Sequence, residues 1–310
     1  MNKEKNFASA VIYAHNAENI IGSFMQKIIM ELEANFEHSE IICVNDCSDD
    51  NTVQAIRSAS DSASNTSVSV LNMSYFHGLE LSMNAGVDLA IGDFVFEFDN
   101  PYMDYDVSEI MKVYCKSLQG YDIVSAVPDR KEQLSSALFY KVFGAFSNLS
   151  YEMHTESFRV LSRRIINRIG AINKTVPYRK AIYAACGLKT SRIVYKPICS
   201  GNQFDKKENA YRRKLAADSL ILFTDLGYKF SMSLTMLMIL ISVFMLAYSV
   251  IIYATRHPVA GWTTTILFLS MAFFGLFGIL TIIVKYLQLL ISLNFKRKQY
   301  CFESIEKLTK

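Results

Sequence analysis

The chain has 310 residues, of which 51% are hydrophobic and 20% are charged, and its formal net charge is +3. This length allows one sizeable α/β domain together with a further segment. The small net charge argues against a nucleic-acid partner, and the apolar excess is high for a chain that is soluble throughout.

The first 125 residues alternate short apolar runs with helical patterns. This order of elements predicts a mostly parallel sheet with right-handed crossovers, a Rossmann-like α/β fold. The predicted strands cover residues 8–14, 40–46, 68–73, 93–99 and 121–127, and the predicted helices cover residues 16–32, 52–59, 80–90 and 107–119.

Polar side chains follow three of these predicted strands. They are Asn16 and Glu18, then Asp46, and then the stretch from Asp99 to Asp104. Ligands of parallel α/β sheets bind beyond the C-terminal ends of the strands, so we expect these residues to share one site. The alternative is that they are ordinary polar loops.

Residues 126–229 are less regular. Helical patterns cover residues 134–148 and 158–169, and residues 206–223 form a basic amphipathic segment. Such a segment is typical of a helix that lies on a membrane surface.

Two uncharged apolar runs follow, residues 230–253 and 259–284. Each exceeds the roughly 20 residues that a helix needs to cross a bilayer. Only five residues, "ATRHP", separate them, which predicts an antiparallel hairpin. Basic residues flank the pair on one side, which places the N-terminal domain and the tail in the cytoplasm. The expected parts are a domain over residues 1–205, a juxtamembrane segment over 206–229, spans over 230–253 and 259–284 in the cytoplasmic membrane, and a basic tail over 285–310.

Four stretches are similar to motifs of a known family. They are "SAVIYAHNAENI" (9–20), "ICVNDCSDDNT" (42–52), "HGLELSMNAGVDLAIGDFVFEFDNP" (77–101) and "SFRVLSRR" (157–164). In order and spacing they resemble the inverting GT-A glycosyltransferases of family 2. Within that family they look most like the polyprenyl-phosphate branch, which includes dolichol-phosphate mannose synthases and bactoprenol glucosyltransferases. The resemblance implies a GT-A fold for the cytoplasmic domain.

This resemblance also implies a reaction. A sugar would move, with inversion, from a nucleotide-sugar donor to a polyprenyl phosphate in the lipid bilayer, for modification of cell-envelope glycans. Family members hold Mg²⁺ or Mn²⁺ with a D-x-D motif, because carboxylate oxygens suit these ions. Asp99 falls on the first Asp of the motif, whereas Pro101 stands in place of the second. Glu97 and Asp104 are alternative sources of a second carboxylate.

The resemblance assigns roles to further residues, each matched to a motif position. Asn16, Glu18, Asp46 and Asp99 would bind the nucleotide-sugar, and His15 would either stack on its base or be an exposed loop residue. Ser157 replaces the family's Asp, so neighbouring Glu156 is the substitute carboxylate. The expected groups are Asp99 and Glu156 for catalysis, Asp99 for the metal, and Arg130, Arg159 and Arg163 for the acceptor phosphate.

A second hypothesis follows from the two replacements of family residues, Pro101 in the D-x-D motif and Ser157 in place of the later Asp. The chain would then be a catalytically degenerate GT-A-like membrane protein that acts as a partner or regulatory subunit. Retention of Asp46, Asp99 and Arg159 favours an active enzyme. A two-helix anchor would also leave room for a homo-oligomer assembled in the membrane.

Overall fold

A computed structural model describes residues 3–130, 154–171, 178–198 and 300–309, together with residue 141 and separate helical residues between 233 and 290. These residues fall into two compact units. One holds the described residues up to 198 together with 300–309, and the other holds those between 233 and 290.

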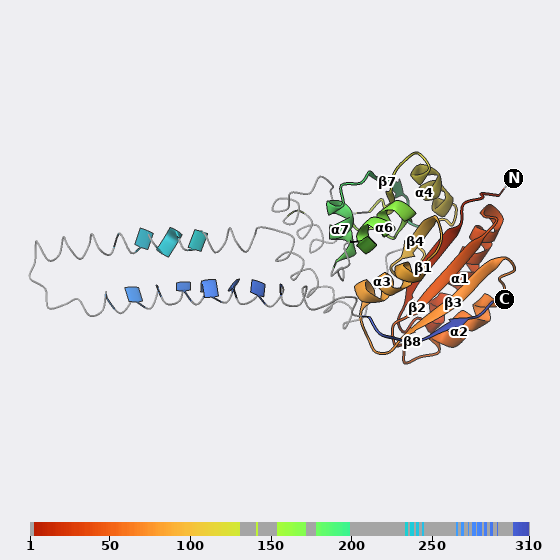
Figure 1. The fold of residues 1–310 in the computed structure, drawn as a ribbon, viewed down its shortest axis with the longest axis horizontal. Coiled ribbons are helices and arrows are strands. Elements are labelled where there is room, and N and C mark those ends of the chain that lie inside the picture. The colour runs from red at the N-terminus through yellow and green to blue at the C-terminus, as the bar shows by residue number, and fades with distance from the viewer. Residues whose placement is uncertain are drawn as a thin grey trace, which may run out of the picture. The chain divides into compact units, whose positions relative to one another are not determined.

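The first unit alternates strands and helices as the sequence predicts (Figure 1). Each of the nine elements expected within residues 8–127 is present, with ends shifted by a few residues at most. In chain order they are β1 (Ala8–Ala14), α1 (Glu18–Asn35), β2 (Ser39–Asn45), α2 (Thr52–Ser60), β3 (Thr66–Met73), α3 (Leu79–Leu89), β4 (Phe94–Phe98), α4 (Glu109–Ser117) and β5 (Ile123–Pro128). The later elements are β6 (Phe158–Ser162), α6 (Arg163–Ala171), α7 (Arg179–Ala185), β7 (Thr190–Tyr195) and β8 (Phe302–Lys307).

The strands of the described residues form one eight-stranded sheet in the order β7-β5-β6-β4-β1-β2-β3-β8. The pairs β1–β2, β1–β4, β2–β3 and β5–β7 are parallel. The pairs β3–β8, β4–β6 and β5–β6 are antiparallel. The α/β prediction is confirmed, and the sheet is mixed because β6 and β8 join it in the opposite direction.

Helices cover both faces of the sheet. Buried side chains of α1, α2 and α4 pack with Ala10 and Ile12 of β1 on one face. Buried side chains of α3, α6 and α7 pack with Val11 and Tyr13 on the other face. Alternate residues of a strand point to opposite faces, so one strand supplies both cores. A Cβ on Gly86 would lie 2.5 Å from Val11, which shows how closely α3 approaches β1.

The prediction of a helix over residues 158–169 was wrong in its first half. Phe158–Ser162 is strand β6, and the helix α6 begins only at Arg163. β6 lies between β4 and β5 and pairs with both, so its backbone hydrogen bonds go to neighbours distant in the sequence. Pairing of this kind outweighs a local helical pattern. The helices predicted over 134–148 and 206–223 lie outside the described residues, apart from residue 141.

The predicted tail over residues 285–310 contains a strand of the main sheet. Phe302–Lys307 forms β8 and runs antiparallel to β3, as the blue strand in Figure 1 shows. Phe302 and Ile305 remain 47% and 45% exposed. The strand is held by its backbone pairing with β3 and by side-chain contacts from Asn72 and Arg57. The sequence of β8 has no buried face that would predict a strand. The strand depends on pairing with β3, which is distant in the sequence.

The second unit contains helical residues between 233 and 244 and between 265 and 290. A methyl group on Gly275 would collide with Met238, and one on Gly278 would lie 3.4 Å from Leu234. The described residues of the two runs therefore lie side by side in antiparallel order. None of the helices, as far as they are described, is long and apolar enough to cross a membrane. The predicted spans (230–253 and 259–284) lie largely outside the described residues, and the juxtamembrane segment (206–229) lies wholly outside them.

Candidate functional site

The parallel strands bring three predicted site residues to one edge of the sheet. In register, Ala14 of β1 lies beside Asn45 of β2, and Ile12 lies beside Phe98 of β4. Asn16, Asp46 and Asp99 directly follow these strand ends. This is the edge at which ligands of parallel α/β sheets bind.

Asp46 is fully buried at this edge and holds the loop between β3 and α3. Its carboxylate accepts hydrogen bonds from the backbone N–H groups of His77 and Gly78, both at 2.8 Å. The Tyr13 hydroxyl donates a third hydrogen bond at 3.0 Å. Gly78 has a φ of 82°, a conformation in which glycine is favoured. The carboxylate of Asp46 therefore orders this loop, and any contact of Asp46 with a nucleotide would be additional.

Asn16 and Glu18 join the turn after β1 to the turn after β2. Asn16 Oδ1 accepts a hydrogen bond from the backbone N–H of Asp49 at 2.9 Å. Glu18 Oε2 accepts hydrogen bonds from the backbone and side-chain nitrogens of Asn51 at 3.0 and 3.1 Å. These contacts fix the turns that border the site.

Aromatic rings line the same edge. The His15 ring lies 4.8 Å from the Phe76 ring, and Tyr75 stacks on His77 at 3.9 Å. Tyr75 and Phe76 are 55% and 45% exposed. Flat, accessible faces of this kind are suited to stacking with a planar base.

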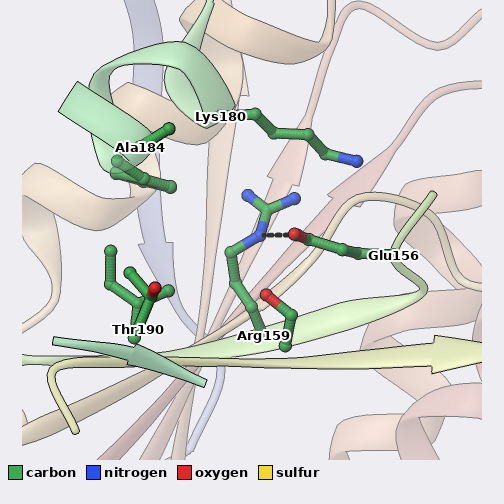
Figure 2. A pocket seen from close by; sticks show the side chains of 8 residues that line it. Glu156, Arg159, Lys180, Ala184 and Thr190 are labelled. Carbon is green, nitrogen blue, oxygen red and sulfur yellow. Dashed lines mark hydrogen bonds and ion pairs between the residues drawn. The ribbon is translucent and has the colours of Figure 1, made fainter. Parts of the chain in front are cut away.

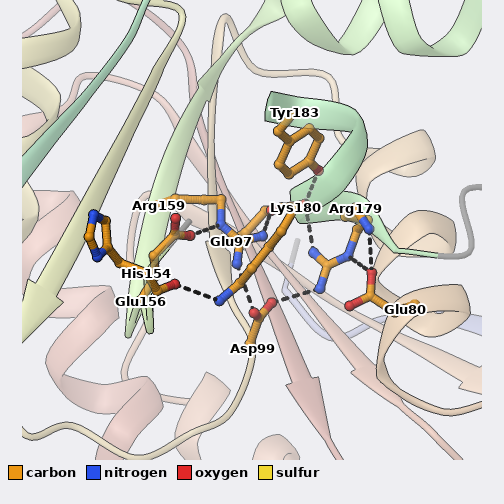
Figure 3. A network of polar contacts seen from close by, with 9 residues as sticks. All are labelled: Glu80, Glu97, Asp99, His154, Glu156, Arg159, Arg179, Lys180 and Tyr183. Carbon is orange, nitrogen blue, oxygen red and sulfur yellow. Dashed lines mark hydrogen bonds and ion pairs between the residues drawn. The ribbon is translucent and has the colours of Figure 1, made fainter. Parts of the chain in front are cut away.

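Asp99 lies between two arginines (Figure 3). Arg179 Nη2 donates to Asp99 Oδ1 at 2.7 Å, and Arg159 Nη2 donates to Asp99 Oδ2 at 2.8 Å. Burial by itself would raise the pKa of the Asp99 carboxyl, but Arg159, Arg179 and then Lys180 hold that pKa well below its usual range. Asp99 is therefore a carboxylate whose two oxygens already accept charge-assisted hydrogen bonds.

Arg159 is buried and contacts two further carboxylates. Its Nη1 donates to Glu97 Oε2 at 2.6 Å, and its Nε donates to Glu156 Oε2 at 2.8 Å. Burial alone would lower the pKa of the guanidinium, but Asp99, Glu156 and Glu97 raise it well above its ordinary value. Glu156 and Asp99 are thus linked through Arg159.

Arg179 repeats this arrangement from helix α7. Its Nε donates to Glu80 Oε2 at 3.0 Å, and its Nη1 lies 2.8 Å from Glu97 Oε1. The second contact is an ion pair, and Nη1 makes no hydrogen bond. Tyr183 completes the cluster by donating its hydroxyl to Glu97 Oε1 at 2.8 Å.

A pocket opens beside this cluster (Figure 2). Glu156, Arg159 and Lys180 supply its charged groups, and its other lining residues are Ile123, Ser125, Tyr183, Ala184 and Thr190. Lys180 Nζ lies 3.5 Å from the backbone oxygen of His154. No carboxylate among the described residues pairs with Lys180, so its ammonium group retains N–H donors for a ligand.

Arg130 and Asp104 belong to a neighbouring cluster. Arg130 Nη1 lies 3.2 Å from Asp104 Oδ2, and the Tyr195 hydroxyl donates to Asp104 Oδ1 at 2.6 Å. Burial, followed by the hydrogen bond to Asp104, raises the pKa of Tyr195 far above its usual range. Asp104 is thus committed to these partners and does not serve as a second carboxylate beside Asp99.

Arg163 does not join the site. Its guanidinium donates to the backbone oxygens of Ala90 and Gly92, with the Ala90 contact at 2.8 Å. These residues precede β4, whereas Asp99 follows it, so the strand separates Arg163 from Asp99. The position of Arg163 therefore does not support its predicted acceptor-phosphate role. Because β6 runs antiparallel to β4, Arg163 follows β6 at the end where β4 begins, whereas Asp99 lies at the end where β4 finishes.

The residues at Asp99 do not fit a divalent cation. Within the described residues, no group of three His, Cys, Asp or Glu side chains is placed to hold a metal ion. Pro101 offers no ligand in place of a second carboxylate, and Glu97 is paired with two arginines. The predicted ligand Asp99 would have to give up its arginine partners to coordinate Mg²⁺ or Mn²⁺.

Sequence reasoning missed Arg179, Glu80 and Tyr183 as members of the cluster. Glu80 lies within a motif used for the family resemblance, but its partner is 99 positions away. Arg179 directly precedes Lys180 in the sequence, at the start of helix α7. The available sequence signal was two adjacent basic residues, Arg179 and Lys180, before a short helical pattern. Only the tertiary structure shows that Arg179 is the buried one of the two.

The fold and this edge of the sheet define a class, that of GT-A proteins. Similar solved structures include glucosyl-3-phosphoglycerate synthase of Mycobacterium tuberculosis in complex with phosphoglyceric acid. It has a TM-score of 0.53 and 13% identity, and the match covers 71% of this chain and 80% of that chain. A mannosyltransferase of Pyrobaculum calidifontis in complex with GDP-Man and Mn²⁺ has a TM-score of 0.50 and 16% identity, over 70% and 63% of the two chains.

Sequence comparison is more specific. Residues 9–131 match the model of glycosyl transferase family 2, which confirms the predicted resemblance to that family over this part of the chain. An uncharacterised glycosyltransferase of Synechocystis sp. is 28% identical over 193 residues, 60% of each chain. A prophage bactoprenol glucosyl transferase homolog of Escherichia coli is 27% identical, over 60% of this chain and 62% of that protein. The chain thus spans about 60% of the length of the curated relatives it matches.

Proposed function

We propose that this protein is a membrane-anchored inverting glycosyltransferase that moves a sugar from a nucleotide-sugar to a polyprenyl phosphate. The observation that carries the proposal is the position of Asp99, at the C-terminal end of β4 in a family 2 domain and between two buried arginines. The similarity to a bactoprenol glucosyl transferase homolog supports a polyprenyl-phosphate acceptor.

The proposed donor would bind across the polar edge of the sheet. Its base would stack on the exposed rings near His15, Tyr75 and Phe76, which lie beside the loop that Asp46 orders. Its diphosphate would then extend toward the end of β4. Asp46 and Asp99 are linked through this loop, because Glu80 follows it in α3 and contacts Arg179, which binds Asp99.

The transfer itself would need little proton chemistry. A phosphate oxygen of the acceptor attacks the anomeric carbon, and the bond from that carbon to the diphosphate oxygen breaks, so the configuration inverts without a covalent intermediate. The acceptor phosphate is already anionic at neutral pH. Glu156 would act by fixing the orientation of Arg159 through their 2.8 Å hydrogen bond. Arg130 is partly exposed, so its guanidinium would contact the acceptor phosphate while keeping its ion pair with Asp104.

The proposed site lies at the cytoplasmic membrane surface. The second unit exposes large apolar side chains, including Met236 at 65%, Leu240 at 60% and Phe244 at 69%. Apolar surface of this extent is unusual for a protein in water and suits contact with lipid. An anionic lipid acceptor presents its phosphate at the bilayer surface, which a hairpin anchor would keep within reach of the domain.

The alternative is a degenerate protein that binds partners and transfers no sugar. One observation favours it, namely that the four carboxylates of the cluster are all engaged by arginines. They are Glu80, Glu97, Asp99 and Glu156.

A transfer assay separates the two functions. Purified full-length protein in detergent would be incubated with a panel of radiolabelled nucleotide-sugars and a short polyprenyl phosphate. A labelled glycolipid is expected from one donor. The enzyme proposal is excluded if no donor yields glycolipid and calorimetry detects no nucleotide-sugar binding.

A further inference from the structure

We propose that the site binds the donor diphosphate without a divalent cation, with Lys180 and Arg159 supplying the cationic contacts from the pocket and Arg179 holding Asp99 in place. This inference rests on the proposed function, because it concerns how the same site holds its donor. It adds a ligand role for Lys180 and a positioning role for Arg179.

The first argument is the saturation of Asp99. Each of its two oxygens accepts a hydrogen bond from a different guanidinium, at 2.7 and 2.8 Å. Both arginines are 1% exposed, and each is held by two further carboxylate contacts. A cation that bound Asp99 would be placed next to two fixed positive charges that cannot move away into solvent.

The second argument is the lack of another ligand. Pro101 has no side-chain donor or acceptor, and Glu97 is 0% exposed behind the arginines. Asp104 is engaged by Arg130 and Tyr195. Mg²⁺ and Mn²⁺ are usually held by one or two carboxylates that are open to the ion, and here the candidates are closed to it.

The third argument concerns the charge that a leaving diphosphate requires. Fixed cations aimed at the developing negative charge stabilise a leaving group as a metal ion does. Lys180 borders the pocket with Arg159, and its ammonium group has the donors to spare. Arg159 uses three of its five N–H groups in hydrogen bonds to carboxylates and lines the pocket, so two N–H groups remain for phosphate oxygens. Arg179 does not line the pocket, and its remaining nitrogen, Nη1, is buried beside Glu97.

The test is calorimetric binding of nucleoside diphosphates to the purified full-length protein. Uridine, guanosine, adenosine and thymidine diphosphate would each be titrated in EDTA and again in excess Mn²⁺. We expect one of them to bind in EDTA, with Mn²⁺ changing its affinity by less than about twofold. Lys180→Gln should weaken that binding by roughly tenfold, and Lys112→Gln, on an exposed face of α4, should leave it unchanged.

A gain-of-function variant makes the test sharper. The double change Pro101→Asp with Arg179→Gln restores a second carboxylate and frees one oxygen of Asp99. We expect Mn²⁺ to raise the nucleotide affinity of this variant by roughly tenfold or more. Far-UV circular dichroism would verify that the variant is folded, and Pro101→Asp alone, which keeps Arg179, should respond to Mn²⁺ much less.

The outcomes are distinct. Binding in EDTA that Lys180→Gln weakens supports the inference. Binding that requires Mn²⁺ in the wild-type protein overturns it while leaving the glycosyltransferase proposal standing. If no nucleotide binds in either condition, both the inference and the proposed function fail.

Discussion

Arg159 of β6 and Glu97 of β4 are register partners in an antiparallel strand pair, and Arg159 Nη1 donates to Glu97 Oε2 at 2.6 Å. Both side chains are excluded from solvent, with exposures of 1% and 0%. A buried pair of this kind offsets a large desolvation penalty only when further hydrogen bonds complete it. Here Asp99, Glu156 and Tyr183 provide them, so the cross-strand pair fixes the geometry of the whole cluster.

Removal of one charge from this cluster should be strongly destabilising. Arg159→Met leaves Glu97 without one of its cations, and breaking a buried pair in this way costs about 3–5 kcal/mol. The measurement is urea unfolding in detergent, followed by far-UV circular dichroism. Arg164→Met is the matched control, because Arg164 pairs with Asp122 but is 66% exposed, and it should change the stability far less. Equal losses in the two variants would contradict the assigned role of Arg159.

Replacement of the central carboxylate should impair transfer. Asp99→Asn keeps the size of the side chain but releases the two arginines from their shared anion. We expect the rate of glycolipid formation to fall on the order of 10²-fold, the scale seen when a preorganised electrostatic contact is lost. Asp106→Asn, an exposed acid before α4, should retain the wild-type rate. An unchanged rate in Asp99→Asn would show that the site has been placed wrongly.

The same carboxylate should make stability depend on pH. The pKa of Asp99 is held well below its usual range in the folded protein, so the folded state binds fewer protons than the unfolded state. Its contribution is then fully present above the unfolded pKa of about 3.9 and is lost as the pH falls below it. Urea unfolding of the wild type and of Asp99→Asn should differ by a constant free energy between about pH 5 and 7. The difference should shrink below about pH 4, and a difference that grows there would be inconsistent with this sign.

Thiol reactivity provides a check on the core. Cys43 in β2 is fully buried, and burial raises the pKa of its thiol to about 12. The thiolate is the reactive form, so Cys43 should resist alkylation at pH 8 in the native state. Cys115 and Cys301 are exposed and should react at once, as mass spectrometry of labelled peptides would show. Rapid native labelling of Cys43 would mean that β2 is not central to the sheet.

Deletion of residues 300–310 should destabilise the domain by removing β8. The edge of β3 would lose its backbone partners, at a cost of roughly 2–4 kcal/mol for several hydrogen bonds, and the exposed edge would favour aggregation. Glu306→Gln removes the ion pair with Arg57 but keeps an oxygen that can accept the hydrogen bond from Asn72, so it should change stability little. Unfolding curves and light scattering of the two variants would distinguish the backbone contribution from the charge. A truncated protein as stable as the wild type would contradict the prediction that β8 stabilises the domain.

The elements up to residue 128 were predictable because each combines a local period with a polar turn. β1, β2 and β4 are short apolar runs, and α1 carries its buried residues on one face. β6 and β8 were not predictable, because each is a strand through pairing with partners far away in the sequence. Their own residues do not distinguish a strand from a helix or a tail.

For the site, the sequence by itself determined that Asn16, Asp46 and Asp99 lie at one edge of the sheet, because they follow parallel strands. It also determined that Pro101 removes the second carboxylate of a D-x-D motif. Only the tertiary structure decided what surrounds Asp99. Arg159 reaches it across an antiparallel strand pair, and Arg179 reaches it from helix α7, 80 positions along the chain. Pairing between charges is set by distance in space, and burial then makes each pair strong, so the partners of a buried carboxylate cannot be inferred from the residues beside it in the sequence.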